Sequence, residues 1–227
     1  MKIIVTTSNR YLHILPIFCF LFNKFWSDRQ QVEIVGYDKP SFELPSNFNF
    51  VSLGKQSEDK QNFTRELRKY FAKQDKFFIW LMEDCFLKTP INFKTLNILK
   101  SLTTKIPDVG RINLSAEVIN QDHSLLGAFD HYQIYKNNKY SLYRLSTQAS
   151  IWSKHFALQY MANDLSPWEF ECQSDHANDE FLILGMDKMD SPLRNNEGVR
   201  KTNIFNYNLD GIPELMIDEM KQAGILK

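Results

Sequence analysis

The sequence carries no net charge and little cysteine. In its 227 residues, 27 basic side chains balance 27 acidic ones, which argues against a broad electrostatic grip on nucleic acid or on an anionic membrane. Cys19, Cys85 and Cys172 are odd in number and widely spaced, so they suggest neither a disulfide framework nor a zinc motif. This cysteine usage is typical of a reducing compartment, and we expect a cytoplasmic protein.

Long apolar runs are also missing. The segment LHILPIFCFLF, from Leu12 to Phe22, is too short to span a bilayer. The polar run TTSNR precedes it and no small-residue cleavage site follows it, so we do not expect a signal peptide. The segment predicts a buried helix. A Walker loop, a Gly-rich dinucleotide fingerprint and a nucleophile elbow are absent as well.

The residues that are present describe an ordinary globular chain of one domain, or at most two. Hydrophobic residues make up 43% and charged residues 24%, a balance that argues against disorder. In the first half, the patterns predict strands at 2–5, 31–37, 48–53 and 77–82, and helices at 11–26 and 59–73. Strands separated by helices indicate an α/β fold with a mostly parallel sheet and helices on its faces.

The second half is less regular. Here the patterns predict helices at 93–104, 155–162, 179–184 and 213–223, and strands at 109–115, 140–145, 148–152 and 207–209. The helix at 179–184 is expected to begin at Asp179 as its N-cap.

Three polar loops follow predicted strands: Thr6-Thr7-Ser8, Tyr37-Asp38 and Glu83-Asp84. Ligands of open α/β sheets bind beyond the carboxyl ends of the strands, so these loops are candidate ligand loops. Glu83-Asp84 is the sharpest feature, because two acids directly after the apolar run FFIWLM are costly unless they meet water, a metal or a cation. A divalent cation that shares a diphosphate would meet that need. The alternative is a loop that faces solvent or caps the next helix.

Two further segments are candidates with ordinary alternatives. In PWEFE, at 167–171, a carboxylate beside aromatic rings suits a general base and Trp168 suits a sugar ring, although a packed aromatic turn with exposed acids gives the same pattern. His176 lies among acids that could complete a metal site, and Arg200-Lys201 could meet a phosphate. Solvated surface positions remain the alternative for all three residues.

The segments IIVTTSNRYLHIL, VEIVGYD and FFIWLMEDCFL resemble the nucleotide half of GT-A fold glycosyltransferases. The later segments YRLSTQASIWSKHFALQYM and LSPWEFE are similar to small glycosyltransferase-like proteins of phages and of bacterial surface-polysaccharide clusters. The resemblance covers roughly residues 1–212. It implies a three-layer αβα GT-A (Rossmann-like) fold in one domain, with a nucleotide-sugar half at 1–115 and an acceptor half at 116–227.

The resemblance also implies roles for individual residues. The nucleotide contacts would be Thr6, Thr7, Ser8 and Asp38, with Arg200 and Lys201 on the diphosphate. The ligands of Mn²⁺ or Mg²⁺ would be Asp84, Glu83 and His176, and the sugar or acceptor pocket would be lined by Gln148, Trp152 and Trp168. The acceptor proton would pass to Glu171, with Glu169 as the alternative. The sequence departs from the family at Cys85, which stands where the Asp-x-Asp metal motif has a second aspartate and which is too soft for a hard cation.

The expected function is transfer of a sugar from a nucleotide sugar to a hydroxyl group. The acceptor is either a glycan or a hydroxymethylated base in phage DNA, and the lack of net charge disfavours the DNA. A non-catalytic carbohydrate- or nucleotide-binding module of the same fold is the alternative. A nucleotidyltransferase is disfavoured, because TTSNR lacks the Gly-rich basic loop that such enzymes use on a triphosphate.

Overall fold

The computed structural model describes residues 1–59, 62–116, 121–172, 179–200 and 203–226. The chain forms two compact units that interleave along the sequence. Unit 1 comprises Met1, Ser57–Trp80 and Asn92–Pro192, and unit 2 comprises Lys2–Gln56, Leu81–Ile91 and Leu193–Lys227. The division into halves at residue 115 stays a prediction.

Unit 2 is built on three parallel strands. β1 (Ile3–Thr6), β2 (Val32–Gly36) and β3 (Phe48–Ser52) lie in the order β3-β2-β1. Ile3 pairs with Val32, and Val32 in turn pairs with Phe48. Every residue of β1 is buried, as the β-branched run IIV leads one to expect.

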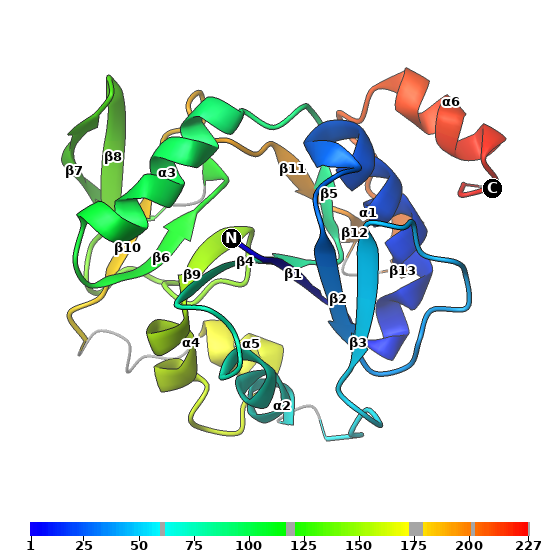
Figure 1. Ribbon diagram of the computed structural model, residues 1–227, viewed down its shortest axis with the longest axis horizontal. Helices are drawn as coiled ribbons and strands as arrows, with labels where there is room; N and C mark the ends of the chain where they lie inside the picture. Colours follow the sequence, from blue (N-terminus) through cyan, green and yellow to red (C-terminus); the bar gives the residue numbers. More distant parts are fainter. Residues whose placement is uncertain (60–61, 117–120, 173–178, 201–202, 227) are drawn as a thin grey trace. The chain divides into compact units, whose positions relative to one another are not determined.

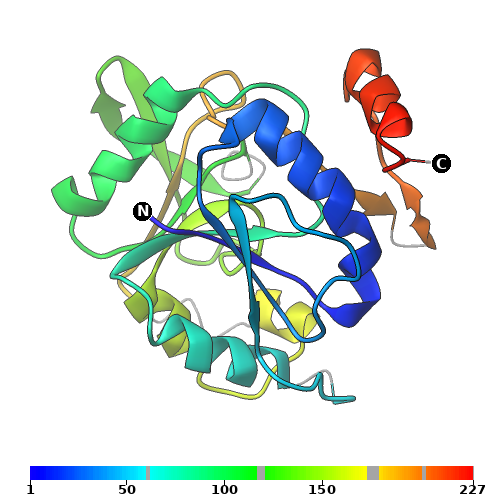
Figure 2. The same cartoon turned by 45° about the vertical axis from the view of Figure 1, so that its right-hand side comes forward.

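One helical rod follows β1, as predicted for residues 11–26. It consists of the 3₁₀ helix η1 (Asn9–Ile14), α1 (Leu15–Phe22) and the π-helical turn η2 (Asn23–Ser27), which continue one another in Figure 2. Pro16 lies in the first turn of α1, where its missing N–H is not needed. Within the described residues, no helix is both long enough and apolar enough to cross a membrane.

The remaining elements of unit 2 are short. They are β5 (Cys85–Leu87), β11 (Asn195–Glu197), β12 (Val199–Arg200), β13 (Asn203–Tyr207) and α6 (Glu214–Gln222). β11 pairs antiparallel with β5, and β12 pairs antiparallel with β13. An ion pair between Lys24 and Glu219 joins the helical rod to α6. As predicted, the chain closes with a helix.

Unit 1 is built on strands in the order β4-β9-β6-β10-β8-β7. Their bounds are β4 (Phe77–Met82, of which the last two residues belong to unit 2), β6 (Val109–Asn113), β7 (His123–Phe129), β8 (Tyr132–Asn137), β9 (Ser150–Ser153) and β10 (Leu182–Gly185). β9 runs antiparallel to both β4 and β6, and β10 runs parallel to β6. Hence β4, β6 and β10 point in one direction, and β9 is a reversed strand between them.

Helices cover both faces of this sheet. α3 (Phe93–Lys105) lies on one side of β6, and α4 (Lys154–Tyr160) lies on the other (Figure 1). α2 (Asn62–Phe71) and α5 (Pro167–Glu171) pack beside each other on the α4 side. The parallel strands β1 to β3 of unit 2, and the common direction of β4, β6 and β10 in unit 1, confirm the predicted fold class, a mixed α/β fold with a mostly parallel sheet.

Two predicted elements of the second half are wrong. Residues 140–145 form turns instead of a strand, and Tyr143 has a φ of 56°, in the left-handed region and outside the β region. The strands of this region are β7 and β8, joined at Asp130 and His131 with φ of 47° and 71°. The two central residues of such a turn are commonly Asn-Gly, and because this turn contains no glycine, the sequence pattern did not predict the hairpin.

The second wrong prediction is the helix at 179–184. This segment enters β10 instead, and Asp179 does not act as an N-cap. Its Oδ1 accepts hydrogen bonds from Nη2 of Arg144 at 2.9 Å and from the backbone N–H of Phe181 at 2.7 Å. The acid therefore neutralises a buried arginine, a role that the local pattern does not reveal.

Candidate functional site

Three loops of unit 2 lie next to one another, each directly after a strand. The backbone N–H of Thr7 donates to the carbonyl of Val35 at 2.9 Å, which joins the loop after β1 to the end of β2. The backbone N–H of Glu83 donates to the carbonyl of Thr6 at 3.3 Å, which joins the turn after β4 to the same loop. We call Thr6–Asn9, Asp38, Gln56 and Glu83-Asp84 the polar edge.

Glu83 is the most deeply buried acid of the polar edge, with 3% of its surface exposed. Burial raises the pKa of this carboxyl well above its usual range, and the negative charge of Asp84 adds to the effect. Hydrogen bonds from the Thr7 hydroxyl and the Ser8 backbone N–H oppose the rise only in part. Oε2 of Glu83 has no hydrogen-bond partner among the described residues, so the burial favours the neutral acid.

Asp84 is half-buried in the turn between β4 and β5. Its carbonyl accepts hydrogen bonds from the backbone N–H of Phe86 at 2.9 Å and from that of Gly198 at 2.6 Å. A Cβ at Gly198 would lie 2.7 Å from the Phe86 ring, so only glycine lets the backbone come this close to the turn. The segment that follows β11 therefore holds Asp84 in place.

Asn9 links the polar edge to two further loops. Its Nδ2 donates to Oδ2 of Asp38 at 2.6 Å, and its Oδ1 accepts the backbone N–H of Asp38 at 3.0 Å. Its own backbone N–H donates to Oε1 of Gln56 at 2.9 Å. Sequence reasoning selected Asp38 but missed Asn9 and Gln56. The predicted ligand loop ended at Ser8, one residue before Asn9, and nothing in the pattern marked Gln56.

Of the three predicted metal ligands, Glu83 and Asp84 lie within the described residues. Among the residues that the structure describes, no group of three or more His, Cys, Asp or Glu side chains is arranged to hold a metal ion. Asp84 is the carboxylate that fits Mg²⁺ better, because this ion commonly takes one or two carboxylates together with substrate phosphates, whereas burial favours the neutral form of Glu83. Cys85 is buried, and burial followed by the Asp84 charge raises the pKa of its thiol, so it offers no thiolate.

Of the predicted residues Arg200, Lys201 and His176, only Arg200 lies within the described residues. Arg200 is the second residue of β12, which places its backbone in unit 2. Lys201 and His176 lie outside the described residues.

The predicted catalytic acids lie in unit 1 and are engaged in hydrogen bonds of their own. Oε1 of Glu171 accepts the backbone N–H and the hydroxyl of Thr147, at 2.6 and 2.7 Å. Oε2 of Glu169 accepts the backbone N–H and the hydroxyl of Ser166, at 2.8 and 2.6 Å, within a capping box at the start of α5. Glu169 therefore stabilises the helix, whereas Glu171 ties the end of α5 to the chain just before Gln148.

The predicted sugar-binding residues differ in exposure. Trp168 is 60% exposed on α5, which leaves its indole open to a ligand. Gln148 is half-buried, and its carbonyl accepts the Ser150 hydroxyl at 2.8 Å. Trp152 has no exposed surface, and its ring lies 5.0 Å from that of Trp80 and 6.1 Å from that of Phe170. The structure thus places Trp152 in the aromatic core of unit 1.

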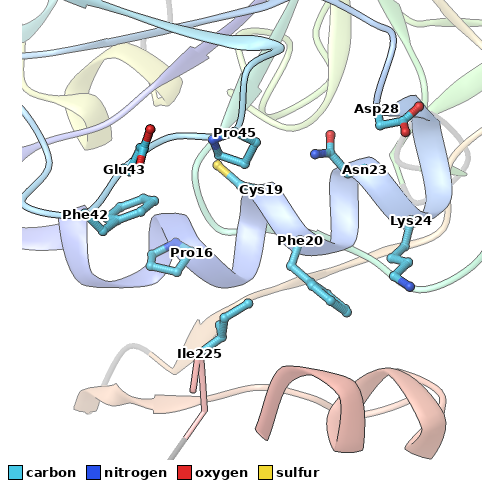
Figure 3. Close-up of a pocket in the computed structure, with 10 residues that line it drawn as sticks. All are labelled: Pro16, Cys19, Phe20, Asn23, Lys24, Asp28, Phe42, Glu43, Pro45 and Ile225. Atoms are coloured by element: carbon cyan, nitrogen blue, oxygen red, sulfur yellow. The ribbon is translucent and has the colours of Figure 1, made fainter. Parts of the chain in front are cut away.

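A pocket of about 530 Å³ lies elsewhere in unit 2, along α1. Figure 3 shows Pro16, Phe20 and Lys24 along the helix, the 42–45 loop above them and Ile225 below. None of its lining residues belongs to the polar edge.

Comparison with known proteins gives a fold resemblance alone. No protein-family model and no curated protein matches the chain. A cytidylyltransferase from Leptospira borgpetersenii serovar Hardjo-bovis (strain JB197) is 12% identical with a TM-score of 0.45, over 98% of this chain and 94% of its own. The bifunctional IspDF from Campylobacter jejuni is 12% identical with a TM-score of 0.45, over 87% of this chain, which spans about half (52%) of that protein. Neither is named as a glycosyltransferase, and a likeness of this degree assigns no activity.

Proposed function

We propose that this protein transfers a glycosyl group from a nucleotide sugar to an acceptor hydroxyl. The observation that carries the proposal is the polar edge. Hydroxyl, amide and carboxylate groups from loops far apart in the sequence meet there, at the carboxyl ends of parallel strands. Open α/β sheets bind nucleotides in this position. The same three segments resemble the nucleotide half of GT-A enzymes, and this resemblance suggests that the bound nucleotide is a nucleotide sugar.

In this proposal the polar edge holds the nucleotide. Thr6, Thr7 and Ser8 contact it from the loop after β1, and Asp38 contacts it from the loop after β2. A divalent Mn²⁺ or Mg²⁺ ion, held by Asp84 with Glu83 beside it, would neutralise charge on the leaving diphosphate. Arg200 and Lys201 serve the same purpose as cations on the protein, and His176 is the third proposed metal ligand.

The transfer breaks the bond between the anomeric carbon and the diphosphate oxygen, which leaves with the electron pair. A new bond forms between that carbon and the acceptor oxygen, and the acceptor proton passes to a carboxylate. We assign this proton to Glu171, since Glu169 is committed to the capping box of α5. Gln148 and Trp168 are the proposed contacts of the sugar or the acceptor.

Nucleotide binding tests the proposal first. Uridine, guanosine and thymidine diphosphates, with and without Mn²⁺, are expected to raise the melting temperature, because a ligand at 100 times its Kd adds about 2.7 kcal/mol to the free energy of unfolding. Asp84→Ala is expected to abolish the part of the shift that depends on Mn²⁺. If no nucleotide binds the wild-type protein, the proposal is wrong.

Product analysis tests the acceptor. Incubation with a panel of nucleotide sugars is expected to glycosylate a glycan or its lipid-linked precursor. A mass increase on the nucleosides of hydroxymethylated DNA would instead identify DNA as the acceptor. Nucleoside triphosphates with sugar phosphates form a third arm, in which release of pyrophosphate would indicate nucleotidyl transfer.

One observation favours a second candidate, a non-catalytic module that binds a nucleotide or a carbohydrate. Both predicted catalytic acids already accept two protein hydrogen bonds each. A module of this kind would bind ligands without hydrolysing or transferring the donor. Turnover of the donor by the wild-type protein distinguishes the two candidates, and in a transferase Glu171→Gln is expected to abolish this turnover and to leave nucleotide binding unchanged.

A further inference from the structure

Two protein hydrogen bonds end on the same oxygen of Glu171. The backbone N–H and the hydroxyl of Thr147 both donate to Oε1, at 2.6 and 2.7 Å. Among the described residues, Oε2 accepts no hydrogen bond from the protein. A carboxylate carries lone pairs on both of its oxygens, so these contacts occupy one oxygen and leave the other able to take a proton. Glu171 and Thr147 are both half-buried, so the pair is not sealed from solvent.

Helix capping does not account for the contact between Glu171 and Thr147. Glu169 accepts its two hydrogen bonds from Ser166, three residues earlier, within the capping box at the start of α5. Glu171 is instead the last residue of α5, where the unpaired backbone groups are carbonyls, which a carboxylate cannot cap. Its donors come from a segment 24 residues away in the sequence. The contact is therefore a tertiary one, and it constrains the position of the Glu171 carboxylate.

The segment that contains Thr147 is held by a buried arginine. Arg111, on β6, has no exposed surface, and its Nη1 donates to the carbonyls of Arg144 and Ser146. The backbone N–H of Gln148 donates to Oγ of Ser146 at 3.3 Å. These contacts hold the backbone on both sides of Thr147, and all of these residues belong to unit 1. The two donors on Oε1 of the carboxylate are thus anchored to a strand, which holds a functional group more precisely than a loop alone.

We propose that Thr147 is a positioning residue, which holds Glu171 so that Oε2 takes the acceptor proton. This inference rests on the proposed function, because it requires Glu171 to act as the base. A carboxylate that rotates freely spends part of its time away from the acceptor hydroxyl, whereas two hydrogen bonds to Oε1 keep Oε2 in one place. The proton passes from the acceptor oxygen to Oε2, and Thr147 acts only through Glu171.

Two substitutions of Thr147 separate positioning from packing. Thr147→Val keeps the shape of the side chain and the backbone N–H but removes the hydroxyl, whereas Thr147→Ser keeps the hydroxyl. The reaction measured is release of nucleoside diphosphate from uridine diphosphate glucose, guanosine diphosphate mannose and thymidine diphosphate glucose, with water and with methyl glycosides as acceptors. Thr147→Val is expected to lower kcat about tenfold or more, as for loss of a hydrogen bond to a charged group, and to leave KM for the donor unchanged. Thr147→Ser is expected to restore kcat.

Thr104→Val is the matched control. The Thr104 hydroxyl donates to the carbonyl of Ser101 at 2.9 Å on α3, so this variant also loses one hydroxyl hydrogen bond. It is expected to keep the wild-type kcat. A merely structural role of Thr147 would lower the melting temperature and leave kcat unchanged when it is measured well below that temperature.

The possible failures are distinguishable. If the wild-type protein turns over a donor and Thr147→Val does so with the same kcat, or if Thr147→Ser is as slow as Thr147→Val, the inference alone is wrong. If the wild-type protein releases no nucleoside diphosphate from any of these donors, the proposed function fails with it.

Discussion

The fold buries the carboxyl group of Glu83 away from water, and this burial makes the stability of the protein depend on pH. Its raised pKa, caused first by burial and then by Asp84, means that the folded protein holds the proton at pH values where the unfolded chain has lost it. The stabilising contribution is complete below the unfolded pKa of about 4.3 and is lost as the pH rises through the raised folded pKa.

Glu83→Gln is expected to remove this pH dependence, because the amide stays neutral. The variant should gain stability relative to the wild-type protein as the pH rises from 4 to 8. Denaturant unfolding across this range measures the difference. Glu43→Gln, at an exposed position, is the control and should follow the wild-type curve. Parallel curves for Glu83→Gln and wild type would contradict the prediction.

Gly198 is the second residue whose environment leads to a prediction. A methyl group here meets the Phe86 ring at 2.7 Å, so Gly198→Ala is expected to lower the free energy of unfolding by about 1–3 kcal/mol. Gly127→Ala is the matched control, because a Cβ there meets nothing within 4 Å. The pair Gly198→Ala with Phe86→Leu should be less than additive. A Gly198→Ala loss no larger than that of Gly127→Ala would rule out the close approach.

Among the elements, β10 begins at a buried ion pair that no sequence pattern predicted. Arg144 and Asp179 have side chains that are 2% and 3% exposed, and they join the 140–145 turns to the start of β10 at 2.9 Å. Asp179→Asn is expected to destabilise the protein by about 3–5 kcal/mol, because it leaves a buried guanidinium without its counter-ion. Asp164→Asn breaks the exposed pair with Arg65 and should cost about 0–1 kcal/mol. Similar losses for both variants would show that burial of the pair is unimportant.

Elements were predictable where their own residues form a continuous apolar run or a periodic pattern of apolar residues. The run FFIWLM coincides with β4, and α3 lies within a residue of its predicted bounds. The errors fall where distant partners decide the structure. The hairpin of β7 and β8 turns on Asp130-His131, a pair without glycine, and β5 exists because β11 pairs with it. Neither the local composition nor the periodicity of a segment indicates which distant strand will pair with it.

At the scale of the whole molecule, the positions of the candidate-site loops were predicted from the sequence, but the hydrogen bonds and burial of their side chains were not. Strand order alone placed Thr6, Asp38 and Glu83 at the ends of strands, and the structure brings these loops together in unit 2. The contacts of Asn9 and Gln56 were not predictable, because they join loops that are 47 residues apart. The burial of Trp152 was hidden for the same reason, since it depends on packing against α5, whereas the capping role of Glu169 follows from the local Ser-x-x-Glu spacing at 166–169, which sequence reasoning overlooked.

The charge balance of the whole chain leads to a prediction about the acceptor. A protein that grips duplex DNA through several phosphates loses about 10³–10⁵ in affinity between 50 and 200 mM salt, because binding releases counter-ions. With 27 acidic and 27 basic residues, this protein lacks the excess of cations that such a grip uses. We therefore expect binding to hydroxymethylated duplex DNA to be weak at 50 mM salt, and transfer to a glycan acceptor to change little up to 200 mM. Fluorescence anisotropy with labelled duplex measures the first quantity, and product formation across the salt series measures the second. Tight DNA binding with a steep salt dependence would show that a local basic surface outweighs the overall balance, and would favour the DNA acceptor.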